Sequence, residues 1–174
     1  EAHAQELAPP PVVEHDLVPD RAPELVETQE ALLALIEELR TAGRFGYDAE
    51  FIGEATFYAR FCVIPVSTLE RITQIDCLAP AMDLLPFWEV LAKPGVEVIV
   101  HAGLQDLEPV QRLTGRPPTD IFDTQIASAF VGQPYPMSLT KLCLALADAD
   151  LGKSSKFSQW DRRPLTDTQK VYAA

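Results

Sequence analysis

The chain has 174 residues, of which 47% are hydrophobic and 23% charged, and its formal net charge is −12 at pH 7. This length suits one domain with a real core, and the composition excludes a disordered or fibrous chain. No apolar run approaches the ~18 residues that a membrane-spanning helix needs, so no membrane partner is expected.

Acidity argues at first sight against a nucleic-acid partner, because phosphates bind Lys and Arg. Residues 1–27, however, carry −6 of the total, and acids in the remainder could belong to a metal site. The three cysteines are odd in number, far apart and set among apolar neighbours: Cys62, Cys77 and Cys143. They indicate buried thiols rather than a disulfide framework or zinc site, and a cytoplasmic location.

The first segment, residues 1–23, is rich in proline and acids and predicts an extended arm, with the folded domain covering residues 24–174. Helical spacing begins after Thr28 and stops at Gly43. The apolar stripe of this helix is expected at Leu32, Leu33, Ile36 and Leu39.

Strand-like runs follow at Phe45–Ile52, Phe61–Ser67 and Arg71–Ile75, and their close spacing predicts antiparallel hairpins. Strands and helices then alternate. The expected elements are a helix at Pro86–Lys93, a strand at Val96–Val100, a helix at Gly103–Leu113, a strand at Asp120–Phe122, and helices at Thr124–Phe130, Ser138–Ala147 and from Thr166 onward. The pattern predicts an α/β fold, a mixed five-stranded sheet flanked by helices.

The first candidate site is the strand Phe45–Ile52. Side chains alternate along a strand, so Asp48 and Glu50 point to one face and their apolar neighbours to the other. Paired carboxylates suit Mg²⁺ or Mn²⁺. In a chain with 26 acids an acid-x-acid pair is unremarkable, and Asp148 with Asp150 forms another, so a structural interpretation stays open.

Two further acids adjoin strand ends. Asp106 follows the strand that ends before His101, and on the expected helix it shares an inward face with Val110 and Leu113. It could be a helix cap or a metal ligand. Asp123 precedes a helix and is expected to be its N-cap.

The last helix begins with Thr166 and Gln169 in the spacing of a capping box. It carries Tyr172. A residue four positions later would share the face of Tyr172.

In this order, the motifs resemble the DEDD 3′-5′ exonucleases, in particular the tyrosine subgroup that includes ribonuclease D. The Asp-x-Glu motif is matched by residues 47–51, the second motif by 101–108, and the start of the Tyr-x-x-x-Asp motif by 172–174. Residues 122–125 and 153–165 are also similar to ribonuclease D. The resemblance implies a ribonuclease H-like fold.

It also implies that Asp48, Glu50, Asp106 and a fourth acid beyond residue 174 hold two Mg²⁺ or Mn²⁺ ions, with Tyr172 orienting or deprotonating the attacking water. The expected function is a 3′-5′ exoribonuclease that trims the single-stranded 3′ end of RNA, as in tRNA or stable-RNA maturation. Alternatives are an exonuclease acting on DNA ends and a catalytically weakened nucleic-acid-binding module. The family often carries a C-terminal nucleic-acid-binding domain.

Five residues are candidates for substrate contact, each with a structural alternative: Phe51, His101, Trp160, Arg162 and Arg163. Residues 153–170 carry a local charge of +3 and contain aromatic side chains, which suits a single strand. Trp160 could instead pack under the last helix, and His101 could be a core histidine. The chain departs from the family where Ala49 replaces a common Thr and Pro65 replaces a common Gln.

Overall fold

The computed structural model describes residues 23–53, 56–151 and 159–173. The expected arm falls almost entirely outside these residues, so it stays a prediction. The same is true of Lys153, Lys156 and Phe157 in the expected basic segment.

A mixed seven-stranded sheet forms the centre of the described chain, in the order β1-β5-β4-β2-β6-β7, with β3 pairing β4 outside this path. Pairings of β4 with β2, β3 and β5 are antiparallel, and β1-β5, β2-β6 and β6-β7 are parallel. The strands are β1 Glu24–Val26, β2 Arg44–Tyr47, β3 Glu50–Ile52, β4 Arg60–Ser67, β5 Ile72–Asp76, β6 Glu97–Val100 and β7 Ile121–Asp123.

The predicted mixed α/β sheet is confirmed, but the count of five strands was too low. One added strand is β1, which pairs with β5. The other arises because the expected strand 45–52 is interrupted between β2 and β3. Asp48 N donates to Pro65 O at 3.3 Å, and Pro65 has no N–H to return the bond, so regular pairing stops there.

Six helices are described: α1 Gln29–Ala42, α2 Leu85–Leu91, α3 Glu108–Thr114, α4 Thr124–Phe130, α5 Leu139–Ala147 and α6 Asp167–Tyr172. The predicted caps are confirmed for α1, where Thr28 begins the helix and Gly43 ends it with φ 72°. The capping box of Thr166 and Gln169 is also present. The apolar stripe of α1 includes Leu35 rather than Leu33, which is 46% exposed.

The helix expected at Gly103–Leu113 was placed wrongly. Turns occupy residues 103–107 and α3 begins only at Glu108. Pro109 explains the difference, because proline fits the first turn of a helix but lacks the N–H that an interior position needs. Val110 is buried as expected, whereas Leu113 is 47% exposed.

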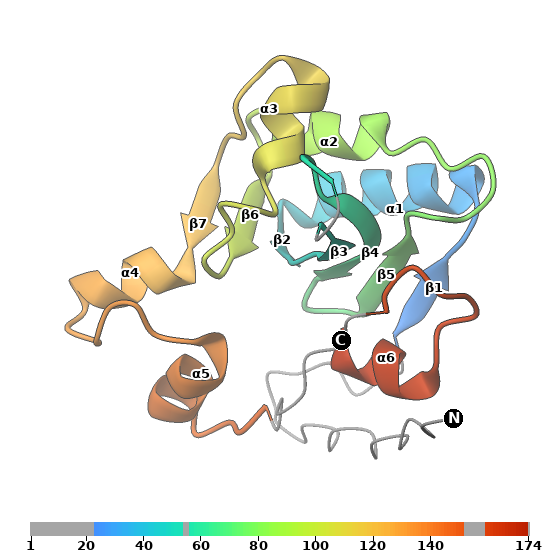
Figure 1. Cartoon of the computed structure of the whole chain (residues 1–174). Coiled ribbons are helices and arrows are strands. Elements are labelled where there is room, and N and C mark those ends of the chain that lie inside the picture. The colour runs from blue at the N-terminus through green and yellow to red at the C-terminus, as the bar shows by residue number, and fades with distance from the viewer. Residues whose placement is uncertain (1–22, 54–55, 152–158, 174) are drawn as a thin grey trace, which may run out of the picture.

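Two apolar clusters cover the two faces of the sheet. α1 and α2 lie on one side, where Leu32, Leu39, Phe45, Phe87 and Trp88 belong to the main core (Figure 1). α6 lies on the other side, over a smaller cluster of Cys62, Val63, Trp160, Leu165 and Ala173. Among the described residues, no helix has both the length and the apolar character needed to cross a membrane.

Candidate active site

Between Phe45 and Glu50 the side chains alternate between buried and more exposed, even where the pairing stops between β2 and β3. Phe45, Tyr47 and Ala49 are buried in the main core, while Asp48 is exposed and Glu50 half-buried. The two carboxylates therefore lie on the side of this strand away from the main core, as their spacing predicted.

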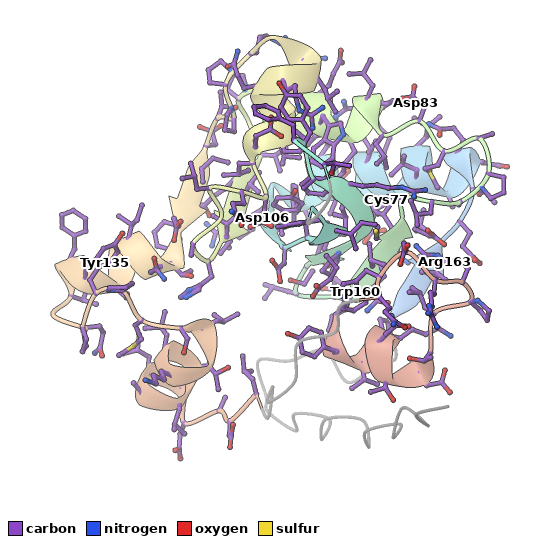
Figure 2. All side chains as sticks on the ribbon, in the orientation of Figure 1. Cys77, Asp83, Asp106, Tyr135, Trp160 and Arg163 are labelled. Carbon is purple, nitrogen blue, oxygen red and sulfur yellow. The ribbon has the colours of Figure 1, made fainter. Side chains whose placement is uncertain are left out.

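Asp106 lies in the turn between β6 and α3, beside β2 (Figure 2). The hydroxyl of Tyr47 donates to the backbone oxygen of Asp106 at 2.7 Å, which ties this turn to the strand of Asp48. Burial, followed by the charge of Asp48, raises the pKa of Asp106 to about 7. Two carboxylates from distant parts of the chain are thus electrostatic neighbours.

Tyr47 is a positioning residue that the sequence did not single out. Its side chain is buried, and burial, then the charges of Asp106, Cys77 and Asp48, raise its pKa well above the ordinary value. The phenol therefore stays protonated and can donate to Asp106. Its place next to Asp48 was visible in the sequence, but its partner lies 59 residues away.

Asp123 fixes the start of the same turn. Its carboxylate accepts from Ala102 N at 3.1 Å and Gly103 N at 3.2 Å, and it caps α4 through Gln125 N at 2.8 Å. Burial opposes ionisation, but these backbone donors outweigh it and lower the pKa of Asp123. The predicted N-cap is confirmed, and the residue also holds the chain that leads to Asp106.

Gly103 is required at this turn. A Cβ there would lie 2.7 Å from the Cβ of Val100, closer than packing allows. The neighbouring Ala102 has φ 57°, so the chain turns sharply as it leaves β6. This sharp turn leads the chain from β6 to Asp106, whose backbone oxygen accepts from Tyr47 of the neighbouring β2.

Tyr172 completes the group from the far end of the chain. It is the last residue of α6 and is half-buried. Burial, then the charges of Glu50 and Asp48, raise its pKa. The charges of Asp48 and Glu50 thus act on Tyr172, and the charge of Asp48 also acts on Asp106.

The expected metal ligands have suitable chemistry without forming a closed site. Carboxylate oxygens suit hard divalent cations, and a cation would favour the ionised form of Asp106, whose pKa is raised by burial and then by the charge of Asp48. Within the described residues, however, no three His, Cys, Asp or Glu side chains form a group that could hold a metal ion.

His101 lies at the end of β6, and both of its ring nitrogens have protein partners. Nδ1 lies 2.9 Å from Thr124 Oγ1, and Nε2 lies 2.9 Å from the oxygen of Met137. This placement supports the structural alternative, a satisfied histidine that joins β6 to α4 and the following loop.

Trp160 and Arg163 are not placed to contact substrate. Trp160 is 2% exposed, with its ring 6.0 Å from that of Tyr172. All five N–H groups of the Arg163 guanidinium donate within the protein, which leaves none for a phosphate. The expectation of substrate contact is therefore corrected for both residues. Trp160 packs in the cluster under α6, and Arg163 is held in an ion pair with Asp76.

Arg162 and Phe51 differ from these two. Arg162 is exposed, so its side chain is accessible. Phe51 is half-buried against Phe61, with ring centroids 5.4 Å apart. Both stay candidates for substrate contact.

Known proteins resemble this chain over most of its length. A family model described as 3′-5′ exonuclease matches residues 23–174. A ribonuclease D of Gluconacetobacter diazotrophicus is 35% identical over 152 residues, 87% of this chain and 39% of the relative. A ribonuclease D of Pseudomonas paraeruginosa is 38% identical over 155 residues, 88% of this chain and 41% of the relative.

Among solved structures, Escherichia coli RNase D is similar with a TM-score of 0.80 and 31% identity, covering 88% of this chain and 41% of that one. The chain spans about two fifths of the length of these relatives. The family match extends over the described core, the carboxylates and α6 alike. On this evidence the chain belongs to the 3′-5′ exonuclease family.

Proposed function

We propose that this chain is the nuclease domain of a 3′-5′ exoribonuclease of the ribonuclease D type, which trims RNA 3′ ends during RNA processing such as tRNA or stable-RNA maturation. The observation that carries the proposal is that Tyr47 ties the turn of Asp106 to the strand of Asp48 in a chain of this family, while the charge of Asp48 acts on both Asp106 and Tyr172. The Escherichia coli relative is described as an exoribonuclease involved in structured RNA processing.

Asp48, Glu50 and Asp106 would hold two divalent ions, Mg²⁺ or Mn²⁺, together with a fourth acid expected four residues after Tyr172. Such ions, when bound, lower the pKa of water and stabilise the leaving 3′-oxygen. The oxygen chemistry of these side chains supports the assignment, as does the mutual repulsion of Asp48 and Asp106.

Tyr172 would orient the attacking water. Because burial and the neighbouring Glu50 raise its pKa, the phenol stays protonated at neutral pH and is a poor base. Of the two roles open to it, hydrogen bonding to the water is therefore favoured over taking its proton. Tyr172→Phe should lower kcat and leave KM nearly unchanged.

The test is hydrolysis of a 5′-labelled single-stranded RNA by the full-length protein with Mn²⁺. We expect stepwise shortening from the 3′ end and loss of at least about 1,000-fold in rate for Asp48→Ala, since metal ions do most of the chemistry. Glu70→Ala, an exposed acid in the turn between β4 and β5, is the matched control. Equal rates for the Asp48 variant and the wild type would contradict the proposal.

A second candidate is a weakened nucleic-acid-binding module, which the open arrangement of the described acids favours. Its signature would be RNA binding without shortening, together with a residue other than Asp four positions after Tyr172.

An exonuclease that acts on DNA ends is the other alternative. Competition between RNA and DNA oligonucleotides shows which of the two substrates the protein prefers. We place the activity in the cytoplasm, since neither Cys62 nor Cys77 forms a disulfide.

A further inference from the structure

Arg163 joins three parts of the chain beneath the sheet. Nε donates to Asp76 Oδ2 at 2.7 Å, and Nη2 donates to Asp76 Oδ1 and, at 2.9 Å, to the oxygen of Cys62 in β4. Nη1 donates to the oxygen of Trp160 at 2.8 Å. One side chain thus connects the end of β5, the first part of β4 and the segment that leads into α6. Figure 2 labels Arg163 and Trp160 on that segment.

The partner of Arg163 is buried. The side chain of Asp76 is 4% exposed, and its Oδ1 also accepts from Leu78 N at 2.8 Å. A carboxylate in such a place needs a fixed cation, because burying an uncompensated charge is costly. Paired through two parallel bonds, Arg163 has little freedom to shift along the strand.

Gln74 provides a second attachment on the same face of β5. It is two residues from Asp76, so the strand period places both side chains on one side. Gln74 is 1% exposed, and its Nε2 donates to the oxygen of Lys170 in α6 at 2.6 Å. β5 therefore holds the last segment at two points, before α6 and within it.

These contacts matter because α6 cannot hold its own position. It has six residues, far below the length at which an isolated helix is stable. Lys170 lies two residues before Tyr172, so a shift at either attachment moves the phenol. Among residues 23–53, 56–151 and 159–173, the apolar packing of the helix comes from the small cluster that includes Trp160 and Leu165.

We propose that Arg163, paired with Asp76, is a positioning residue that acts through Tyr172, with Gln74 as its partner along the strand. Together they fix where α6 lies and hence where the Tyr172 hydroxyl stands relative to Glu50. The proposal rests on the proposed function, since it assigns Tyr172 a part in the hydrolysis.

The test uses Arg163→Lys in the full-length protein, which keeps the charge but loses the paired bonds. We expect kcat to fall on the order of 10-fold, because small misplacement of a catalytic group has large effects, while KM stays within about twofold. Arg71→Lys is the matched control: Arg71 is also 26% exposed in its side chain and binds two carboxylates, but those belong to Glu24 and Glu38. Its kcat should not change.

A double-mutant cycle separates positioning from general weakening. In a Tyr172→Phe background, Arg163→Lys should have little further effect on kcat, because both changes remove the same contribution. Multiplying effects would overturn the proposal. A rise in KM with a smaller salt dependence would also overturn it, since that is the behaviour of a phosphate contact.

A second variant tests the proposal if Arg163→Lys does not fold. A spectroscopic measurement tests it independently of activity, and so of the proposed function. Gln74→Met removes the donor to Lys170 at nearly constant volume, and the same drop in kcat is expected. With 3-fluorotyrosine at position 172, the ¹⁹F resonance should move in Arg163→Lys and Gln74→Met but not in Arg71→Lys. An inactive wild type would reject the proposed function alone, whereas an unmoved resonance would reject the positioning role.

Discussion

An arginine side chain lies at each end of β5, and the two differ in the carboxylates that they bind. Arg71 precedes the strand and binds Glu24 and Glu38, whose side chains are 58% and 37% exposed. Arg163 reaches the other end and binds Asp76, which is 4% exposed. The arginine side chains themselves are equally exposed, so the difference lies in the partner and in what each pair holds.

Arg71 joins elements that are also joined by other means. β1 pairs with β5 in the sheet, and α1 buries four leucine and isoleucine side chains in the main core. Arg163 holds a segment with a short helix and a small apolar cluster. Directional bonds thus replace packing where packing is scarce, and they define position more narrowly than apolar contact does.

Asp76→Asn should give the largest change in stability. It leaves Arg163 facing a neutral amide in a buried place, and we expect unfolding to become easier by about 3 kcal/mol, the low end for a buried pair because part of Arg163 reaches solvent. Urea unfolding at pH 7 measures the change. If the loss of stability is no greater than that expected for an exposed ion pair, the Arg163–Asp76 pair does not differ in stability from the pairs of Arg71.

Asp106 offers the opposite case, a partly buried carboxylate that faces another acid. Its pKa of about 7 lies above the ordinary 3.8, so its contribution to stability is full below about pH 4 and is lost as pH rises through 7. In EDTA we expect a loss of about 2 kcal/mol between pH 4 and pH 8, after allowance for solvent screening.

Thermal melts across this range measure the loss, and Asp106→Asn should flatten it. Mg²⁺ should reduce the loss in the wild type, because a cation favours the ionised carboxylate. A pH profile for the variant that matches the wild type would show that another group is responsible.

The capping box at the start of α6 should have a smaller effect. Thr166→Ala removes the hydroxyl that accepts from Gln169 N at 3.2 Å and should cost about 1 kcal/mol. Hydrogen exchange should show faster opening of α6 than of α1. Uniformly faster exchange in both helices would mean that α6 is not a separate unit.

The smallest effect is expected at the exposed arginine. Glu38→Gln leaves Arg71 with Glu24 and a neutral hydrogen-bond partner, so stability should change by less than about 0.5 kcal/mol. The measurement is the same urea titration as for Asp76→Asn. A loss comparable to that at Asp76 would contradict the view that burial of the partner makes the difference.

Local patterns explain why much of this molecule could be predicted. The alternation around Asp48, the cap at Asp123 and the capping box at Thr166 are set by neighbours within four residues, and all three are confirmed. The start of α3 is also marked locally, because Pro109 fits a first turn, but the apolar spacing of residues 106, 110 and 113 favours an earlier start.

Long-range partners explain what could not be predicted. Arg162 and Arg163 are adjacent, identical and both exposed, yet Arg163 binds the buried carboxylate of Asp76, 87 residues away. Among 26 acids nothing local marks Asp76 as that partner. The same holds for Tyr47, whose acceptor at Asp106 is known only once the turn after β6 is placed.

The break opposite Pro65 has a mechanical consequence. Asp48 follows β2, which pairs with the last two residues of β4, whereas Glu50 begins β3, which pairs with the first part of β4. The two acids of one short motif thus stand on different parts of the sheet. The first part of β4 also pairs with β5, at Val63 and Asp76, so the spacing between the two acids depends on the same two strands that Arg163 joins.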